Sequence, residues 1–192
     1  CLPENSVAIL NEDDPYVKAM DSLAKGKTIT YGIERNATCI GSHLRYKKDG
    51  IKFTCKCYDE VFDIFLPMIG EHNVYDALAA IVAGRVLGIK SNTIRKGLSE
   101  FTGTPMRQEI VPFEDIVILN DAYNANPSSM AEAIKALGQL EGKRKIAMLG
   151  DMLELGDYTE QAHREIGQLL AEEGYNVDIW NEGLGENPHV QD

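Results

Sequence analysis

Two kinds of apolar segment are missing from this sequence. No apolar run approaches the roughly 20 residues that a membrane-spanning helix needs, and the chain does not open on the apolar core of a secretory signal peptide. The sequence therefore does not indicate a membrane-embedded or exported protein. We expect a soluble protein of the cytoplasm.

Basic residues are also few. The chain carries 19 Lys and Arg against 30 Asp and Glu, a net charge of −11. Most of the imbalance is local, because residues 1–150 hold 18 basic and 19 acidic side chains, whereas residues 151–192 hold eleven acids and Arg164. A nucleic-acid binder shows a basic stripe interleaved with aromatic side chains, and this sequence has none. We therefore expect no nucleic-acid partner.

Cysteine is scarce, and its spacing excludes two common kinds of site. The four cysteines lie in the first third of the chain, at Cys1, Cys39, Cys55 and Cys57. None of them forms a zinc pair or a Cys-x-x-Cys redox pair. Cys55 and Cys57 lie two residues apart on an expected strand, so both thiols point to one face. We expect reduced, partly buried thiols.

A phosphate-binding P-loop is missing as well. The nearest match is Gly26-Lys27-Thr28, but the motif requires a glycine at the position of Asp21. It also requires a strand before it and a helix after it, whereas here a predicted helix precedes and a predicted strand follows. Nucleotide chemistry within these 192 residues therefore lacks its usual phosphate cradle.

What is present is the composition of a globular protein. Apolar residues make up 44% of the chain and charged residues 26%, which is enough apolar material for a core, and the length allows one large domain or two small ones. The Asp49-Gly50 pair predicts a hairpin turn inside a meander. The predicted strands of this first part are residues 6–11, 28–33, 38–47, 51–57 and 61–66. The predicted helices are an Ala-rich one, which begins at residues 72–73 and ends near residue 88, and a shorter one at about residues 92–100.

The second part of the chain alternates strands and helices. Strands are predicted at residues 116–120, 145–149 and 177–180, with helices at about 129–140 and 159–173. This order predicts an α/β fold with a parallel sheet and right-handed crossovers. The loops after the strands of such a sheet meet at one edge, where ligands bind. The polar residues expected at that edge are Asp121, Tyr123, Asn124, Asn126, Asp151 and Glu154.

The loop Asp121-Ala-Tyr-Asn-Ala-Asn-Pro127 is the strongest candidate for binding. It places a carboxylate, a phenol and two amides after an apolar strand that we expect to be buried, and it is longer than a simple connection requires. The alternative is that these side chains satisfy the backbone of the turn. Ser128 or Ser129 is the expected cap of the next helix, with Ser129 and Glu132 as a capping box.

Three further candidates each have a structural alternative. Asp151 and Glu154 lie in a glycine-bounded loop that suits Mg²⁺ or a substrate ammonium group, or they favour the dipole of the next helix. His72 and Asn73 open a helix, where they can bind a flat nitrogenous ring, although a lone histidine is usually structural. Arg107 can clamp a phosphate through two N–H groups, or it is a surface residue.

Four segments resemble the Mur ligases in their order and spacing. The segments are Gly70-Glu-His-Asn-Val-Tyr-Asp-Ala-Leu-Ala-Ala80, Pro105-Met-Arg-Gln-Glu109, Asn120-Asp-Ala-Tyr-Asn-Ala-Asn-Pro127 and Leu149-Gly-Asp-Met-Leu-Glu-Leu-Gly156. The last two are the most specific, since sister ligases carry different residues there. They are most similar to the F-type branch, which adds D-alanyl-D-alanine. The resemblance runs from about residue 11 to residue 180.

This resemblance implies an ATP-dependent amide ligase of peptidoglycan precursor synthesis. In the family, the γ-phosphate of ATP passes to the carboxylate of UDP-N-acetylmuramoyl-tripeptide, and the amine of D-alanyl-D-alanine attacks the acyl phosphate. Residues 1–104 would be the C-terminal portion of the central ATP-binding domain, and residues 105–180 the start of the C-terminal Rossmann-like domain. Residues 181–192, which contain little apolar material, are expected to be a disordered or non-native tail.

The resemblance also implies a fragment and roles for single residues. The P-loop and the Mg²⁺ ligands would lie upstream of Cys1, which agrees with a start other than Met. The ATP-binding residues would be His72, Asn73, Asp76, Arg107 and Asp121. Tyr123, Asn124 and Asn126 would face ATP or the incoming dipeptide, and Asp151 and Glu154 are counted as substrate-binding. Asp76 replaces the usual asparagine of the family, and a carboxylate cannot donate a hydrogen bond unless it is protonated.

Two alternatives remain open. The first is a relative with the same architecture and another acceptor, such as a folylpolyglutamate synthase or another Mur ligase. The Tyr-Asn-Ala-Asn-Pro loop argues against it. The second is a non-catalytic module that holds a nucleotide or a peptide. A Gly-x-x-Gly-Lys-[ST] element upstream of residue 1 would favour the ligase over this module.

Overall fold

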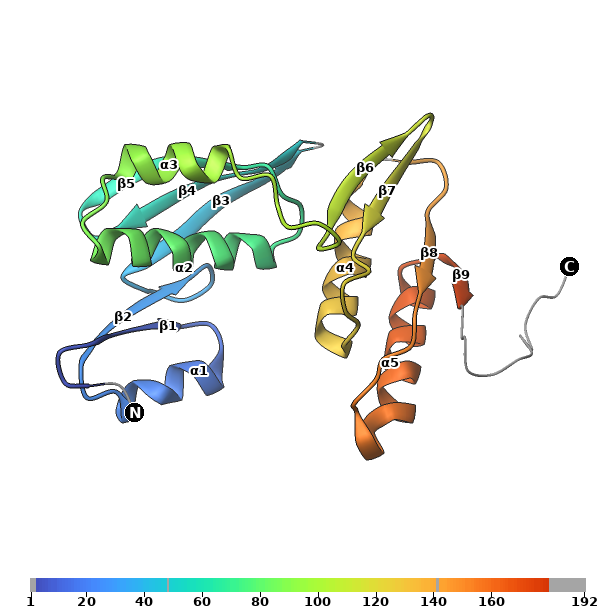
Figure 1. Ribbon diagram of the computed structural model, residues 1–192, viewed down its shortest axis with the longest axis horizontal. Helices are drawn as coiled ribbons and strands as arrows, with labels where there is room; N and C mark the ends of the chain where they lie inside the picture. Colours follow the sequence, from blue (N-terminus) through green and yellow to red (C-terminus); the bar gives the residue numbers. More distant parts are fainter. Residues whose placement is uncertain (1–2, 48, 141, 180–192) are drawn as a thin grey trace, which may run out of the picture. The chain divides into compact units, whose positions relative to one another are not determined.

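The computed structural model describes residues 3–47, 49–140 and 142–179 (Figure 1). The chain divides into two units, Cys1–Thr102 and Gly103–Asp192, which are taken in turn below. The predicted tail at residues 181–192 lies outside the described residues. Among the residues that are described, no helix is long and apolar enough to cross a membrane.

The first unit contains one five-stranded mixed sheet with the order β1-β2-β3-β4-β5. The strands are β1 (Val7–Asn11), β2 (Lys27–Gly32), β3 (Cys39–Lys47), β4 (Gly50–Cys57) and β5 (Glu60–Leu66). β1, β2 and β3 pair in parallel, and β3, β4 and β5 pair antiparallel. The predicted meander and its hairpin are therefore confirmed, with Gly50 as the first residue of β4.

Helices cover this sheet and complete its core. α1 (Pro15–Ala19) and the 3-10 turn η1 (Met20–Leu23) connect β1 to β2, while α2 (His72–Val86) packs on β1 to β4 and α3 (Ser91–Ser99) packs on β5 and α2 (Figure 1). α2 contributes an Ala-rich apolar stripe in which Val74, Leu78, Ile81 and Val82 are fully buried. Alternate β4 residues face this stripe, as the period of two of a strand requires.

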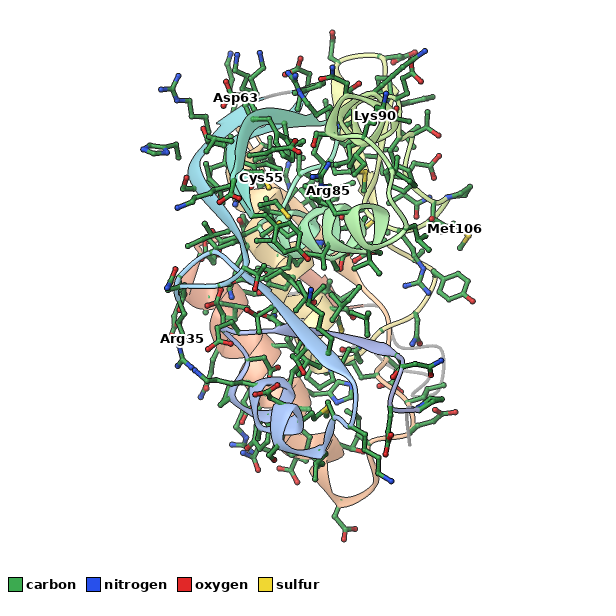
Figure 2. The ribbon with its side chains drawn as sticks, turned by 90° about the vertical axis from the view of Figure 1, so that its left-hand side faces the viewer. Arg35, Cys55, Asp63, Arg85, Lys90 and Met106 are labelled. Carbon is green, nitrogen blue, oxygen red and sulfur yellow. The ribbon has the colours of Figure 1, made fainter. Side chains whose placement is uncertain are left out.

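Three cysteines belong to this core. Cys39, Cys55 and Cys57 are free thiols with no exposed surface, and the sulfur atoms of Cys39 and Cys55 are 3.5 Å apart. Cys55 lies in the interior of the unit (Figure 2). Hydrogen bonds with Cys55 and Cys57, together with burial, raise the pKa of the Cys39 thiol. The expected reduced thiols are confirmed at these three positions, and they are fully rather than partly buried.

Gly26 has a packing role at the start of β2. The amide of Lys27 donates to the carbonyl oxygen of Ser6 (3.1 Å), which begins the parallel pairing of β2 with β1. A Cβ atom at Gly26 would lie 2.2 Å from that same oxygen, so only glycine allows the two strands to approach. The Gly26-Lys27-Thr28 segment therefore serves strand pairing.

In the described part of the second unit, the chain forms two two-stranded sheets and two main helices. Its elements are β6 (Glu109–Phe113), β7 (Ile116–Asn120), α4 (Pro127–Gln139), β8 (Ile146–Leu149), the 3-10 turn η2 (Gly156–Tyr158), α5 (Thr159–Glu172) and β9 (Asn176–Ile179). β8 and β9 pair in parallel across α5, as predicted. The core lies between α4, α5 and β8, with Ile134, Ala162 and Leu170 at its centre.

One predicted feature of this unit is wrong. The sequence predicts that residues 116–120 form a buried strand of a parallel sheet, but β7 pairs antiparallel with β6. Phe113 pairs with Ile116 across the two-residue turn Glu114-Asp115, in which Glu114 has φ +50°. Neither Gly nor Asn marks this turn, which is why the hairpin was missed. With β6 as the only strand paired to β7 in the described part of the chain, Ile116 and its neighbours are 45–60% exposed.

Candidate functional site

The first group of predicted site residues lies on the first turn of α2. His72 and Asn73 are partly buried, and Asp76 is exposed one turn along the helix. The side-chain nitrogen of Asn73, Nδ2, donates to the carbonyl oxygen of Ile69 (2.6 Å) and to Nε2 of His72 (2.9 Å). Since that nitrogen can only donate, Nε2 of His72 accepts, and the imidazole orientation is set by Asn73.

The second group forms around Arg107 and Tyr123. The guanidinium carbon of Arg107 lies 4.0 Å from the centre of the Tyr123 ring, within cation–π distance. Tyr123 is 62% exposed, so the stack lies at the surface of the unit. The backbone amide of Tyr123 donates to the carbonyl oxygen of Met106 (3.1 Å), and this joins the loop after β7 to the segment before β6. The structure thus brings together two residues that are 16 positions apart in the sequence.

Asp121 stabilises the same arrangement. Its Oδ1 atom accepts a hydrogen bond from the backbone amide of Gln108 (3.1 Å). Met106 and Gln108, on either side of Arg107, have φ of +61° and +49°, a region that costs free energy for any residue other than glycine. Met106 points outward at the edge of the unit (Figure 2). Strained backbone held by a carboxylate is typical of functional segments, and the sequence alone did not show it.

The rest of the loop after β7 divides into an exposed part and a structural part. Asn124 is exposed, whereas Asn126 caps α4 and accepts a hydrogen bond from the amide of Ser129 (2.9 Å). The hydroxyl oxygen of Ser129 in turn accepts a hydrogen bond from the backbone amide of Asn126 (3.3 Å), so the capping box is Asn126 with Ser129. The predicted serine cap is wrong because α4 begins earlier, at Pro127, and Glu132 pairs with Lys135 instead (2.9 Å).

The third group is Asp151 and Glu154 in the loop after β8. Oδ1 of Asp151 lies 2.6 Å from Nε2 of His163 on α5. Nδ1 of His163 donates to the carbonyl oxygen of Thr159 (2.8 Å), which fixes the ring. Glu154 is exposed and has φ +63°. Sequence reasoning missed His163, because nothing in the 12-residue separation signals the contact with Asp151.

The predicted common edge is not formed in the described part of the chain. β7 and β8 belong to separate sheets, so Asp121 and Asp151 do not follow neighbouring strands. The α2 residues belong to the first unit and the other two groups to the second. Among the described residues, no three His, Cys, Asp or Glu side chains gather in a way that could hold a metal ion.

A further carboxylate, Asp13, forms a cluster of hydrogen bonds at the end of β1. It accepts from three successive backbone amides, those of Ile33 (2.6 Å), Glu34 (3.0 Å) and Arg35 (2.9 Å), and from the hydroxyl of Tyr75 (3.1 Å). Partial burial acts to raise the pKa of Asp13, but these hydrogen bonds outweigh it and the pKa lies below its usual value. The sequence suggested only that this turn ends a strand.

Asp13 should make the first unit sensitive to acid. Because its folded pKa lies below the unfolded value of about 3.9, its contribution to stability is complete above that value and is lost as the pH falls through the folded pKa. We expect Asp13→Asn to lower the free energy of unfolding by about 1–2 kcal/mol at pH 7, and by clearly less at pH 2–3.

Urea unfolding at both pH values, with hydrogen exchange of the β1 and β2 amides, measures this effect. Asp14→Asn is the matched control, since it removes the same charge one residue along and Asn also caps helices such as α1. An equal loss of stability at the two pH values in Asp13→Asn would contradict the prediction.

Comparison with known proteins identifies the family that this chain matches and proteins that are similar to it. The Mur ligase middle domain matches residues 1–84, and the Mur ligase glutamate ligase domain matches residues 106–189. The UDP-N-acetylmuramoyl-tripeptide--D-alanyl-D-alanine ligase of Bacillus subtilis (strain 168) is 39% identical over 172 residues, which are 88% of this chain and 36% of that protein.

Two solved structures show a similar fold. MurF from Acinetobacter baumannii superposes with a TM-score of 0.85 at 28% identity, over 93% of this chain and 39% of that one. The MurF ligase from Thermotoga maritima in complex with ADP has a TM-score of 0.78 at 22% identity, over 93% of this chain and 44% of that one. The α/β fold class is therefore confirmed. The chain spans less than half the length of these relatives.

Proposed function

The chain belongs to the Mur ligase family, and from that premise we propose that it contributes to an ATP-dependent ligase that joins D-alanyl-D-alanine to UDP-N-acetylmuramoyl-tripeptide. The relatives from Bacillus subtilis and Acinetobacter baumannii, which are named for this branch, support the choice of acceptor. The reaction would proceed by transfer of the γ-phosphate to the tripeptide carboxylate. The amine of the dipeptide would then attack the acyl carbon and phosphate would leave.

The observation that carries this proposal is the stack of Arg107 on Tyr123. A guanidinium group presents its N–H donors in one plane and matches two phosphate oxygens at once. Stacking on a ring limits the rotation of that plane, and the Asp121–Gln108 hydrogen bond holds the backbone that carries it. This is the preorganisation that stabilises charge on a phosphoryl group during transfer.

The other predicted residues have complementary roles in this proposal. His72, Asn73 and Asp76 would bind the adenine. Tyr123 and Asn124 would face ATP or the dipeptide, and Asp151, oriented by His163, would bind the dipeptide ammonium with Glu154. Asn126 would act through the start of α4, since its side chain caps that helix. No cluster within the described residues fits Mg²⁺, so none of these residues is assigned to the metal.

A ligation assay with the full-length protein tests the proposal. UDP-N-acetylmuramoyl-tripeptide, with either lysine or diaminopimelate as its third residue, would be incubated with ATP and D-alanyl-D-alanine. By mass spectrometry, we expect a product that is heavier than the precursor by one dipeptide less one water. A coupled assay should detect the release of one ADP per product. Matched reactions would contain glutamate with a folate, or diaminopimelate with UDP-N-acetylmuramoyl-L-alanyl-D-glutamate.

Two results would contradict the proposal. Product formation from glutamate and a folate, or from diaminopimelate and UDP-N-acetylmuramoyl-L-alanyl-D-glutamate, would assign the protein to a different ligase. Binding of nucleotide without any ligated product would favour the non-catalytic module.

A further inference from the structure

We propose that Asp13 is a positioning residue for the nucleotide site, which holds the first turn of α2 against the ends of β1 and β2. This inference rests on the proposed function, because His72 and Asn73 on that turn are the residues assigned to the adenine. Tyr75 makes the connection: it lies on the same turn and donates its hydroxyl to Oδ2 of Asp13 (3.1 Å). Asp13 itself would not touch the nucleotide.

The carboxylate of Asp13 is fixed from several sides. Oδ2 accepts from the amides of Ile33 and Glu34 as well as from Tyr75, and Oδ1 accepts from the amide of Arg35. The loop that carries Arg35 lies between β2 and β3 (Figure 2). Since three consecutive amides converge on one carboxylate, the side chain cannot rotate without breaking several hydrogen bonds at once. The loop, the end of β1 and α2 are thereby joined at one point.

Gly32 leaves the space that this carboxylate occupies. A Cβ atom at Gly32 would lie 2.8 Å from Oδ2 of Asp13 and 3.0 Å from Oδ1. Any side chain at this position would therefore displace the carboxylate from its donors. Gly32 is the last residue of β2, so a larger residue at this strand end would disrupt the hydrogen bonds of Asp13.

A second hydrogen bond holds the same turn from another strand. The hydroxyl of Tyr46 on β3 donates to Oε2 of Glu71 (2.8 Å), the residue before His72. Burial and this contact raise the pKa of Tyr46 to about 12, so the hydroxyl is a donor at neutral pH. His72 and Asn73 thus lie between two attachments, at Glu71 and at Tyr75.

These attachments supply what apolar packing does not. Val74, Ala77 and Leu78 bury the inner face of the helix, but apolar burial has no direction and tolerates small shifts along the axis. A hydrogen bond fixes distance and angle, and a displacement of a binding group by about 1 Å strongly weakens binding or catalysis. Loss of the Tyr75 contact should therefore alter the position of His72 and Asn73 more than the stability of the helix.

Steady-state kinetics of the full-length ligase tests the inference through Tyr75→Phe, which removes one hydroxyl and keeps the ring. We expect the KM for ATP to rise about three- to tenfold, with kcat at saturating ATP and the KM for D-alanyl-D-alanine within about twofold. Asp13→Asn should raise the KM for ATP at least as much. The controls are Tyr16→Phe, at a tyrosine that is 82% exposed, and Asp14→Asn, and both should have the KM for ATP of the unmodified protein.

His72→Ala separates this inference from the proposed function. A rise in the KM for ATP in both His72→Ala and Tyr75→Phe supports the positioning role. If His72→Ala raises it and Tyr75→Phe does not, the positioning role of Asp13 is wrong while the adenine assignment stands. If neither variant changes it, the adenine assignment fails and the positioning role fails with it. A fall in kcat with an unchanged KM for ATP in Tyr75→Phe would also overturn the inference.

Discussion

Replacing Arg107 with alanine is expected to lower kcat of the full-length ligase by about ten- to a hundredfold. The side chain supplies charge-assisted hydrogen bonds, each worth roughly 1.5–3 kcal/mol, to a phosphate that gains charge in the transition state. The loss should fall mainly on kcat if Arg107 engages the phosphate only once the domains have closed on it. Initial rates over a range of ATP concentrations measure kcat and KM separately.

A matched control distinguishes this role from a loss of surface charge. Arg164→Ala removes the same group from the same unit, at an exposed position where Arg164 pairs with Glu160, and it should leave kcat unchanged. Arg107→Lys keeps the charge but loses the planar group that stacks on Tyr123, so we expect an intermediate kcat. A kcat equal to that of the unmodified protein in Arg107→Ala would remove Arg107 from the site.

Asp121 should affect the same step through the backbone. Its carboxylate accepts from the amide of Gln108, next to Arg107. Asp121→Asn keeps an oxygen that can accept this hydrogen bond, whereas Asp121→Ala leaves a buried donor unsatisfied. We therefore expect a larger fall in kcat for Asp121→Ala than for Asp121→Asn. A fall in kcat for Asp121→Asn that is as large as or larger than the fall for Asp121→Ala would instead show that the negative charge itself contacts the nucleotide.

The largest expected effect is the inactivity of these 192 residues on their own. Phosphoryl transfer needs a glycine-rich backbone cradle, its lysine and metal ligands around the β- and γ-phosphates. The sequence contains no P-loop, and Gly26-Lys27-Thr28 instead begins β2. We expect ATP to bind no more tightly than about 1 mM, roughly −4 kcal/mol, with no detectable hydrolysis or ligation.

Titration calorimetry and a phosphate-release assay on the isolated chain measure both quantities. The residues proposed to contact ATP are His72 and Asn73 in one unit and Arg107 and Asp121 in the other. If both pairs contact one ATP molecule, binding also carries the entropic cost of ordering the two units. Adding the same ATP concentration to His72→Ala should give an equally weak signal. Micromolar binding, or turnover that depends on Mg²⁺, would show that a phosphate site lies within this chain.

Local sequence signals predicted most of the elements of this protein. The Ala-rich stripe of α2, the alternation along β4 and the Asp49-Gly50 turn each carry their own period or turn chemistry, so neighbouring residues suffice to identify them. β6 was not predicted, because it contains Pro112 and because the Glu114-Asp115 turn after it lacks the usual hairpin residues. The predicted cap of α4 lies two or three residues after the observed one, since Asn, Ser and Pro all occur where helices begin.

The candidate residues were predictable as types but not as contacts. The sequence indicated Arg107, Asp121 and Tyr123 as polar residues near loops, while their stacking and hydrogen bonds depend on the positive φ angles of Met106 and Gln108. Such angles are imposed by the surrounding fold rather than preferred by these residues. The roles of these residues in catalysis stay predictions until the variants above are measured.

By itself, the sequence determined the α/β class, the periods of the buried faces and the motifs of a Mur ligase, because these depend on residue type and spacing along the chain. Only the tertiary structure decided that β7 pairs with β6, that Asp151 meets His163, and that Asp13 joins the β2–β3 loop to Tyr75 across 62 residues. These contacts join distant segments. A hydrogen bond requires the donor–acceptor distance to be correct to within a few tenths of an ångström, and it also requires a suitable angle. Residue spacing carries no information at that scale.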